Sequence, residues 1–345
     1  MLRSLLPAVL ALTLAAGSAM AEARIRVSAS IVPIHGLVAA VMEGVAEPDL
    51  ILPPGASPHG YALRPSGALA LARADVIFRV GPSLEAFLNR PLANISGKAK
   101  VVDLIGTPGL LLLPVRDNEA FEPHDHDHGG HAGHADHEKH ADHDGHDDHE
   151  KHADHDGHDD HDKHAGHDDH ERPTDQHVWL DPKNAIAIVR HVADVLSEAD
   201  PTGAETYRAN ATRTIGRLND LEAQTANRLA SVAARPFIVF HDAYQYFENR
   251  FGLTAAGSIA INPEVAPGAR QISQIRSRIA DQHINCVLAE PQFNSDIVEA
   301  LASDDHVHVG VVDPVGTTAR SASDGYFGVI DRMVSELTTC LGPAG

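Results

Sequence analysis

Histidine is the residue type with the greatest chemical potential in this sequence, and its distribution is uneven. Of the 25 histidines in 345 residues, 17 lie between His124 and His170. The same segment holds 16 Asp or Glu and 3 Lys, which leaves it a formal charge of −13. The unit EKHADHDGHDDH occurs twice in succession, from Glu138 and from Glu150. Because neutral imidazole is a common ligand of borderline metals, we predict that this segment binds metal.

The His-rich segment, residues 124–170, lacks the features of a folded element. From His128 onward every third residue is histidine, a spacing that matches neither the helical period of about 3.6 nor the strand period of about 2. Alanine is its only apolar residue type, so burial cannot offset the entropy of ordering the chain. We expect a disordered, exposed loop with many weak, interchangeable metal sites. A solvated spacer or a pH-responsive segment is the alternative interpretation.

The other eight histidines differ in their position relative to apolar runs. In open α/β sheets, ligands bind at the carboxyl ends of strands, so a polar residue that follows a buried run is a candidate. His241 directly follows the run FIVF, His59 follows LIL through a turn, and Asp313 follows VGVV. His177, in DQHVWLDP, has no strand before it and is the weaker candidate from position alone.

His59, His177, His241 and Asp313 together form a four-coordinate set of three imidazoles and one carboxylate. Zn²⁺ sites are usually tetrahedral and use nitrogen, sulfur and oxygen ligands, so this set suits zinc. An anionic Asp would also offset part of the metal charge in a cleft of low dielectric constant. We predict no metal role for the remaining five, which are His35, His191, His283, His306 and His308.

Apolar runs alternate with helical patterns on both sides of the His-rich segment. Before it, strands are predicted over 25–31, 74–80 and 101–104, and helices over 36–44 and 66–73. After it, strands are predicted over 237–240, 254–259, 286–289 and 308–312, and helices over 244–251, 270–283, 297–302 and 326–341. This alternation is typical of parallel sheets covered by helices, so the predicted fold class is α/β with two Rossmann-like lobes.

A helical region separates the two α/β regions. Asp181 and Pro182 predict a helix start, with Asp as the N-cap. Pro201 opens a second helix that runs without proline to about Val232, long enough at roughly 45 Å to join two lobes. The predicted domains are an N-terminal lobe over 22–123 and 171–200, the disordered loop over 124–170, a long rigid linking helix over 201–233 and a C-terminal lobe over 234–345.

The first 21 residues predict export. Arg3 precedes a short apolar stretch, and Ala19-Met20-Ala21 has the small-x-small pattern of a cleavage site, so the mature chain is expected to begin after Ala21. The only two cysteines, Cys286 and Cys340, are then predicted to form one disulfide in an oxidising compartment, with two buried free thiols as the alternative. The net charge of −21 argues against nucleic acid as a partner.

The motifs GASPHGYALRPS, DQHVWLDPKN, FHDAYQYF, EPQF at Glu290–Phe293 and VDPVGTT occur in this order. Together they resemble the cluster A-I metal-binding solute-binding proteins of ABC importers. The acidic His-rich insert and the imidazole at position 241, rather than a carboxylate, resemble the zinc-specific ZnuA branch. The resemblance covers nearly the whole mature chain. It implies two α/β lobes bridged by a rigid helix, with one metal held in the cleft between them by His59, His177 and His241.

The resemblance leaves the fourth ligand open. Some zinc members place Glu directly before the first ligand histidine, where this sequence has Pro58. Others use a carboxylate at the position of Asp313, which we prefer, with a water molecule or a loop imidazole as alternatives.

The leading hypothesis is a periplasmic receptor that captures Zn²⁺ and delivers it to an inner-membrane ABC permease, with the His-rich loop as an accessory low-affinity collector. It is expected to act as a monomer, to accept zinc from a periplasmic metallochaperone, and not to be an enzyme. The alternatives are a periplasmic zinc buffer or metallochaperone, and a manganese-type solute-binding protein. A secreted zinc hydrolase is disfavoured, because the sequence lacks the H-E-x-x-H signature and a G-x-S-x-G elbow.

Overall fold

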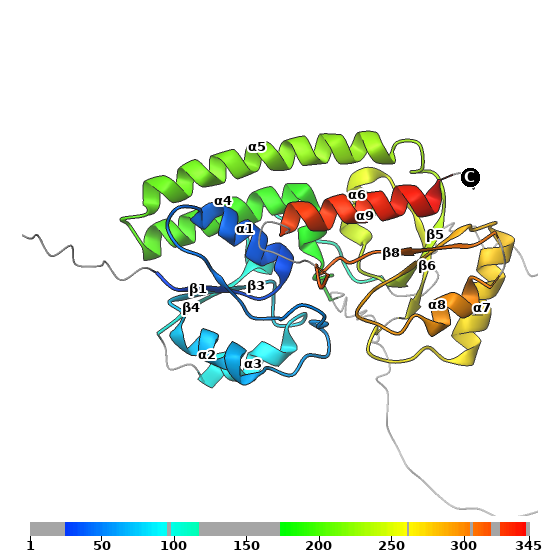
Figure 1. Cartoon of the computed structure of the whole chain (residues 1–345), viewed down its shortest axis with the longest axis horizontal. Helices are drawn as coiled ribbons and strands as arrows, with labels where there is room; N and C mark the ends of the chain where they lie inside the picture. The colour runs from blue at the N-terminus through cyan, green and yellow to red at the C-terminus, as the bar shows by residue number, and fades with distance from the viewer. Residues whose placement is uncertain are drawn as a thin grey trace, which may run out of the picture.

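The computed structural model describes residues 25–94, 98–116, 173–260, 262–303, 306–318 and 325–342. The predicted signal peptide over 1–21 and the His-rich segment over 124–170 lie outside these ranges. Within them the chain forms two α/β lobes, side by side beneath the long helix over Ala204–Leu229 (Figure 1). The predicted fold class is confirmed.

The N-terminal lobe is built on a parallel four-stranded sheet. Its strands are β1 (Val27–Ala29), β2 (Asp49–Leu50), β3 (Val76–Arg79) and β4 (Lys100–Asp103), in the order β2-β1-β3-β4. Helices α1 (Val32–Met42), α2 (Pro65–Arg73) and α3 (Ala86–Asn94) follow the first three strands, and the 3₁₀ helix η1 (Leu104–Gly106) follows the fourth. All strand pairs are parallel, so their carboxyl ends share one edge.

The C-terminal lobe repeats this plan. Strands β5 (Phe237–His241), β6 (Ala255–Ala260), β7 (Cys286–Ala289) and β8 (His308–Val311) pair in parallel in the order β6-β5-β7-β8. Helices α6 (Gln245–Phe251), α7 (Ala269–Asp281), α8 (Asp296–Leu301) and α9 (Tyr326–Leu341) lie between and after them. Along β5, Phe237 and Val239 face one apolar core while Ile238 and Phe240 face another, as the two-residue period of a strand requires.

Two long helices follow one another between the two sheets along the chain, and the second of them contacts both lobes. Helix α4 (Pro182–Ala199) begins with Asp181 as its N-cap, whose side chain accepts a hydrogen bond from Lys183 N. Helix α5 (Ala204–Leu229) has 26 residues, about 39 Å at 1.5 Å per residue. It is shorter than the helix predicted over 201–233 and extends over both lobes (Figure 1).

One apolar core runs through both lobes and ties them together. It includes residues of α1, α4, α5 and α9, and Trp179 and Phe237 on either side of the lobe boundary. At Gly36 in α1, an added Cβ would lie 2.5 Å from Tyr326 N, so the first turn of α9 packs directly on the backbone of α1. The shared core makes the lobes one packed unit.

A disulfide joins Cys286 at the start of β7 to Cys340 near the end of α9. It fastens the last helix to the C-terminal sheet, as predicted from the sequence. In the described part of the chain, no helix combines the length and the apolar character that crossing a bilayer requires.

Candidate metal centre

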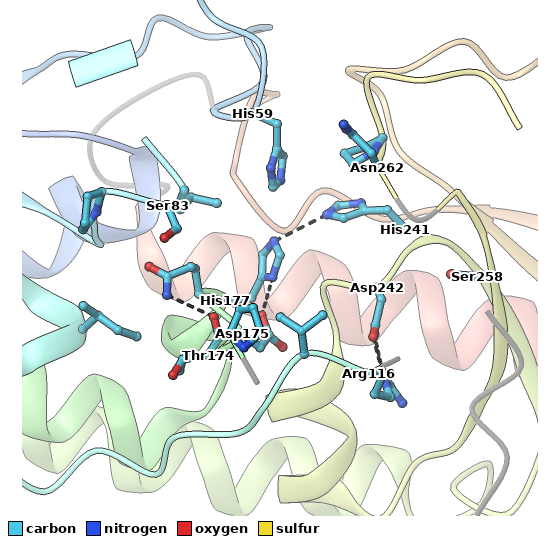
Figure 2. A pocket seen from close by; sticks show the side chains of 17 residues that line it. His59, Ser83, Arg116, Thr174, Asp175, His177, His241, Asp242, Ser258 and Asn262 are labelled. Carbon is cyan, nitrogen blue, oxygen red and sulfur yellow. Dashed lines mark hydrogen bonds and ion pairs between the residues drawn. The ribbon is translucent and has the colours of Figure 1, made fainter. Parts of the chain in front are cut away.

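The structure brings His59, His177 and His241 together at the edge where the strands of both sheets end. His59 lies in the loop that follows β2, and His241 is the last residue of β5. His177 immediately precedes the 3₁₀ helix η2 (Val178–Leu180). One ligand nitrogen from each of the three lies within 4.8 Å of the other two (Figure 2). Among the residues that the structure describes, this is the one group of three or more such side chains that could hold an ion.

His241 is fixed by a buried carboxylate. Its Nδ1 lies 2.5 Å from Glu290 Oε1, and both side chains are almost completely buried. A carboxylate can only accept, so Nδ1 donates and the Nε2 lone pair is directed away from Glu290. The second oxygen of Glu290 accepts a hydrogen bond of 2.7 Å from Gln292 Nε2. The orientation of the His241 ring is therefore set before any ligand arrives.

His177 is held in the same way from the other lobe. Its Nδ1 donates to Asp175 Oδ1 at 2.7 Å, and the same oxygen accepts the His177 backbone N–H at 3.0 Å. The ring is buried and lies beside the indole of Trp179. Trp179 Nε1 in turn donates to Pro314 O in the C-terminal lobe at 2.9 Å. The carboxylate and the packing leave His177 Nε2 directed at the centre of the cluster.

The two fixed imidazoles meet at a distance that suits a shared ion. His177 Nε2 and His241 Nε2 lie 3.4 Å apart. Two nitrogens bound to one tetrahedral zinc at about 2.0 to 2.1 Å would lie about 3.3 Å apart. When both Nδ1 atoms carry protons, the two Nε2 lone pairs face each other, an arrangement that a cation between them would stabilise. The pair is thus preorganised for a metal ion.

His59 completes the triangle without a partner of its own. Its ring centre lies 5.7 Å from that of His177 and 5.3 Å from that of His241. The Nε2 atom is buried and has no hydrogen-bond partner in the described structure. Because burying an unpaired polar atom costs free energy, such an atom in a site of this kind points to a ligand.

The electrostatics of the three rings differ. Burial, with repulsion from the His241 and His177 rings, lowers the pKa of His59 to about 2, so that this imidazole is neutral. Burial also lowers the pKa of His241, but the Glu290 carboxylate outweighs it and the net shift is upward. A metal must therefore displace a proton from His241 at a pH where His59 holds none.

The histidines lie in a cleft of about 710 Å³. Figure 2 shows its lining side chains, which come from both lobes. Ser83 and Leu84 contribute from the N-terminal lobe, and Asp242, Ser258 and Asn262 from the C-terminal lobe. The cleft gives a small ligand a path to the three nitrogens.

Asp313, the predicted fourth ligand, has other partners in this structure. Its carboxylate is buried and accepts hydrogen bonds from the backbone N–H and the hydroxyl of both Thr317 and Thr318, at 2.7 to 3.2 Å. These bonds hold the turn that follows β8. The structure does not bring Asp313 into the cluster of ligand atoms, and its role as a ligand stays a prediction.

The five histidines without a predicted metal role lie outside the cluster. His35 lies in α1 and its Nε2 is 2.9 Å from Pro48 O, while His191 lies in α4. His283 follows α7 with a positive φ of 52°, His306 lies in an exposed turn before β8, and His308 is the first residue of β8.

Two carboxylates of the site occur in motifs of the sequence, but no role was predicted for them. Glu290 directly follows β7, so the rule that selected His241 and Asp313 would also have selected it. Asp175 follows no strand, and its only signal is its place two residues before His177 in DQH.

The chain matches known proteins over nearly its full length. Residues 27–340 match the family model described as "ZnuA: Zinc-uptake complex component A periplasmic". The chain is 44% identical over 325 residues to the high-affinity zinc uptake system protein ZnuA of Brucella abortus (strain 2308), covering 94% of each chain. It is 33% identical over 320 residues to the protein of that name from Yersinia pestis, covering 90% of each.

Solved structures share the fold. A crystal structure of ZnuA superposes with a TM-score of 0.69 at 18% identity, covering 92% of this chain and 99% of that one. The periplasmic zinc binding protein TroA from Treponema pallidum superposes with a TM-score of 0.68 at 18% identity, with the same coverage. The family match over residues 27–340, together with 44% identity to a curated relative, shows that the chain belongs to the ZnuA family of periplasmic zinc-uptake proteins.

Proposed function

We propose that this chain is a periplasmic receptor that binds one Zn²⁺ through His59, His177 and His241 and delivers it to an inner-membrane ABC permease. The observation that carries this proposal is the pair of Nε2 atoms 3.4 Å apart, each on a ring whose Nδ1 is held by a buried carboxylate. Family membership supports zinc uptake as the purpose of the site.

The donor set favours zinc over manganese. Mn²⁺ prefers oxygen ligands, whereas imidazole suits zinc. The two carboxylates nearest the cluster, Asp175 and Glu290, direct an oxygen at an imidazole Nδ1. They therefore support the imidazoles as ligands. The fourth position is left to Asp313, water or a loop imidazole, and the Asp313 carboxylate accepts hydrogen bonds from Thr317 and Thr318 in this structure.

Transport also fits these groups better than catalysis does. A catalytic zinc keeps an open position for water beside a general base. Because Asp175 and Glu290 already accept hydrogen bonds from the imidazole Nδ1–H groups, neither is placed to act as that base. We further propose that residues 1–21 are a signal peptide cleaved near Ala21, which the measured mass of the mature protein would test.

The experiment is a zinc titration of the mature protein lacking residues 124–170. We expect one tight site in this variant. His241→Ala should weaken that site by about 100-fold to 1,000-fold, since structural zinc sites draw roughly 10 to 16 kcal/mol from about four ligands. His191→Ala, in α4 and outside the cluster, is the matched control and should bind zinc as the unaltered site does. Unchanged zinc affinity in His241→Ala would refute the site.

For the His-rich segment we propose an accessory role, in which its 17 histidines hold zinc weakly and raise the local concentration beside the cleft. The test compares zinc transfer into the cleft from the loaded segment with transfer from free zinc. If the segment gives no faster transfer, the role is wrong.

The zinc-buffer alternative predicts instead that deleting 124–170 removes most zinc binding. A monomeric state and a metallochaperone donor are further parts of the proposal, to be tested by sedimentation and by transfer assays.

A further inference from the structure

Next to the three histidines lies a second polar cluster, in which Arg116 meets two carboxylates of the C-terminal lobe. Arg116 Nε donates to Asp242 Oδ2 at 2.8 Å, and Nη2 donates to the other oxygen of Asp242. Nη1 and Nη2 donate to the two oxygens of Glu248 at 3.1 and 2.7 Å. The side chains of Arg116, Asp242 and Glu248 are only 20%, 18% and 8% exposed. Paired hydrogen bonds between guanidinium and carboxylate are the strong form of an ion pair.

The two carboxylates of this cluster connect Arg116 to the strand end that carries His241. Asp242 is the residue directly after His241 and lines the same cleft (Figure 2). Glu248 Oε2 also accepts the backbone N–H of Ala255 at 3.0 Å, which links it to the first residue of β6. A guanidinium that holds Asp242 therefore holds the backbone at the end of β5, where His241 lies.

The backbone before Arg116 is connected to the segment that carries His177. The segment before it pairs with the segment before His177, through the bridge between Pro114 and Thr174 and the bond from Asp175 N to Leu113 O at 2.9 Å. Asp175 is the residue that orients His177.

The two paired segments, around 113–114 and 174–175, also form hydrogen bonds with α6 in the C-terminal lobe. The hydroxyl of Tyr246 accepts from Leu113 N at 3.0 Å and donates to Asp175 O at 2.7 Å. Gln245 Nε2 donates to Pro114 O at 2.9 Å. The ion pairs of Arg116 with Asp242 and Glu248 add to these contacts. Arg116 is thus connected to His177 through the paired segment and to His241 through Asp242.

The charges make the arrangement depend on the guanidinium. Asp242 and Glu248 bind the same guanidinium, and the side chains of both are mostly buried. Without the cation, these two carboxylates would repel each other and move apart. That movement would shift the end of β5 relative to the segment that carries His177.

We propose that Arg116 is a positioning residue of the zinc site, which sets the spacing between His177 and His241 by clamping the paired segment to Asp242 and Glu248. This role rests on the proposed function of the site. It concerns zinc affinity and ligand geometry rather than contact with the ion.

The test uses the full mature chain and measures zinc affinity by competition with a chelator, and the visible spectrum of the Co²⁺ form, which reports ligand geometry. We expect Arg116→Met to weaken zinc binding by about tenfold, the lower end of the range for groups that support metal ligands, and to alter the Co²⁺ bands. Arg116→Lys keeps the charge without the planar fork and should restore part of the loss.

Arg250→Met is the matched control. Arg250 makes a partly buried two-point ion pair of its own with Asp181, with both bonds at 2.7 Å, and no hydrogen bond to any of the three histidines. It should lower the melting temperature of the metal-free protein while leaving zinc affinity and the Co²⁺ spectrum unchanged.

Suppose that the unaltered chain has a tight zinc site and that folded Arg116→Met keeps the same zinc affinity and Co²⁺ spectrum. That result would overturn the role of Arg116 and leave the proposed function intact. An equal loss of zinc affinity in Arg250→Met would also overturn it, because the effect would then be general destabilisation. Absence of any tight zinc site in the unaltered chain would overturn the proposed function and this role with it.

Discussion

His177 Nε2 and His241 Nε2 lie 3.4 Å apart although the two residues come from opposite sides of the lobe boundary. Each ring is fixed at Nδ1 by a carboxylate of its own lobe, Asp175 for His177 and Glu290 for His241. An ion bound between them therefore joins the lobes as well as the side chains.

A stabilising effect of zinc follows from this relationship. A ligand that binds only the folded state raises the free energy of unfolding, by about 4 kcal/mol when its free concentration is 1,000 times Kd. We expect calorimetry of the mature protein to show a melting temperature that rises with zinc and returns on chelation. His241→Ala should remove most of this rise, and a rise of the same size in that variant would place the effect elsewhere.

Glu290→Gln should weaken zinc binding by about 10-fold to 100-fold. The neutral amide cannot match the charged acceptor that fixes His241 and makes its Nε2 more basic. Chelator competition measures the change. Glu299→Gln, at an exposed position of helix α8 in the same lobe, serves as the control and should leave zinc affinity unchanged. Equal affinities of Glu290→Gln and the unaltered protein would show that the carboxylate is not needed for binding.

Zinc affinity should fall as the pH is lowered through the raised pKa of His241. Burial lowers this pKa and Glu290 outweighs it, so the proton competes with zinc from above pH 6.5 downward. Below that pKa, affinity should drop by about tenfold per pH unit, because one proton must leave for each ion bound. His59, with a pKa lowered to about 2, adds no competition between pH 5 and 8.

The same titration distinguishes the cause of this pH dependence. In Glu290→Gln the upward shift is lost, so the fall in zinc affinity should begin at a lower pH. Its deficit relative to the unaltered protein should shrink toward pH 5. A parallel decline in both proteins would mean that another group releases the proton.

The sequence predicted site residues best where they directly follow a regular strand. His241 could be selected because the buried run before it predicts β5, and a parallel sheet presents its ligands at the ends of such runs. Glu290 obeys the same rule after β7, but the sequence used it only as part of the EPQF motif, because no local pattern identifies His241 as its partner.

Other features depend on contacts that no local pattern encodes. His177 is positioned by the pairing of Pro114 with Thr174, in two segments separated by the His-rich segment. Its position in the sequence therefore made it the weaker candidate, and the family resemblance strengthened it. Helix α3 was not predicted because Pro91 interrupts its short helical pattern; the helix nevertheless forms, with Leu88 buried in a small apolar cluster.

Asp313→Asn should affect stability more than zinc binding. Its carboxylate accepts four hydrogen bonds from Thr317 and Thr318, so we expect a loss of about 1 to 3 kcal/mol in unfolding free energy. Zinc affinity should change by less than tenfold, as expected for a residue outside the cluster. A loss as large as that of His59→Ala would instead identify Asp313 as the fourth ligand.

Removal of the disulfide should separate stability from function. The bond between Cys286 and Cys340 closes a loop with a sequence separation of 54, worth about 4 kcal/mol in the chain-entropy model. The variant with both cysteines replaced by alanine should therefore unfold at lower denaturant, measured by circular dichroism. Its zinc affinity should be retained, because the bond holds β7 to α9 through the first residue of the strand, whereas Glu290 lies beyond its opposite end. A loss of zinc affinity in the folded variant would show that the position of β7 in the sheet is itself set by α9.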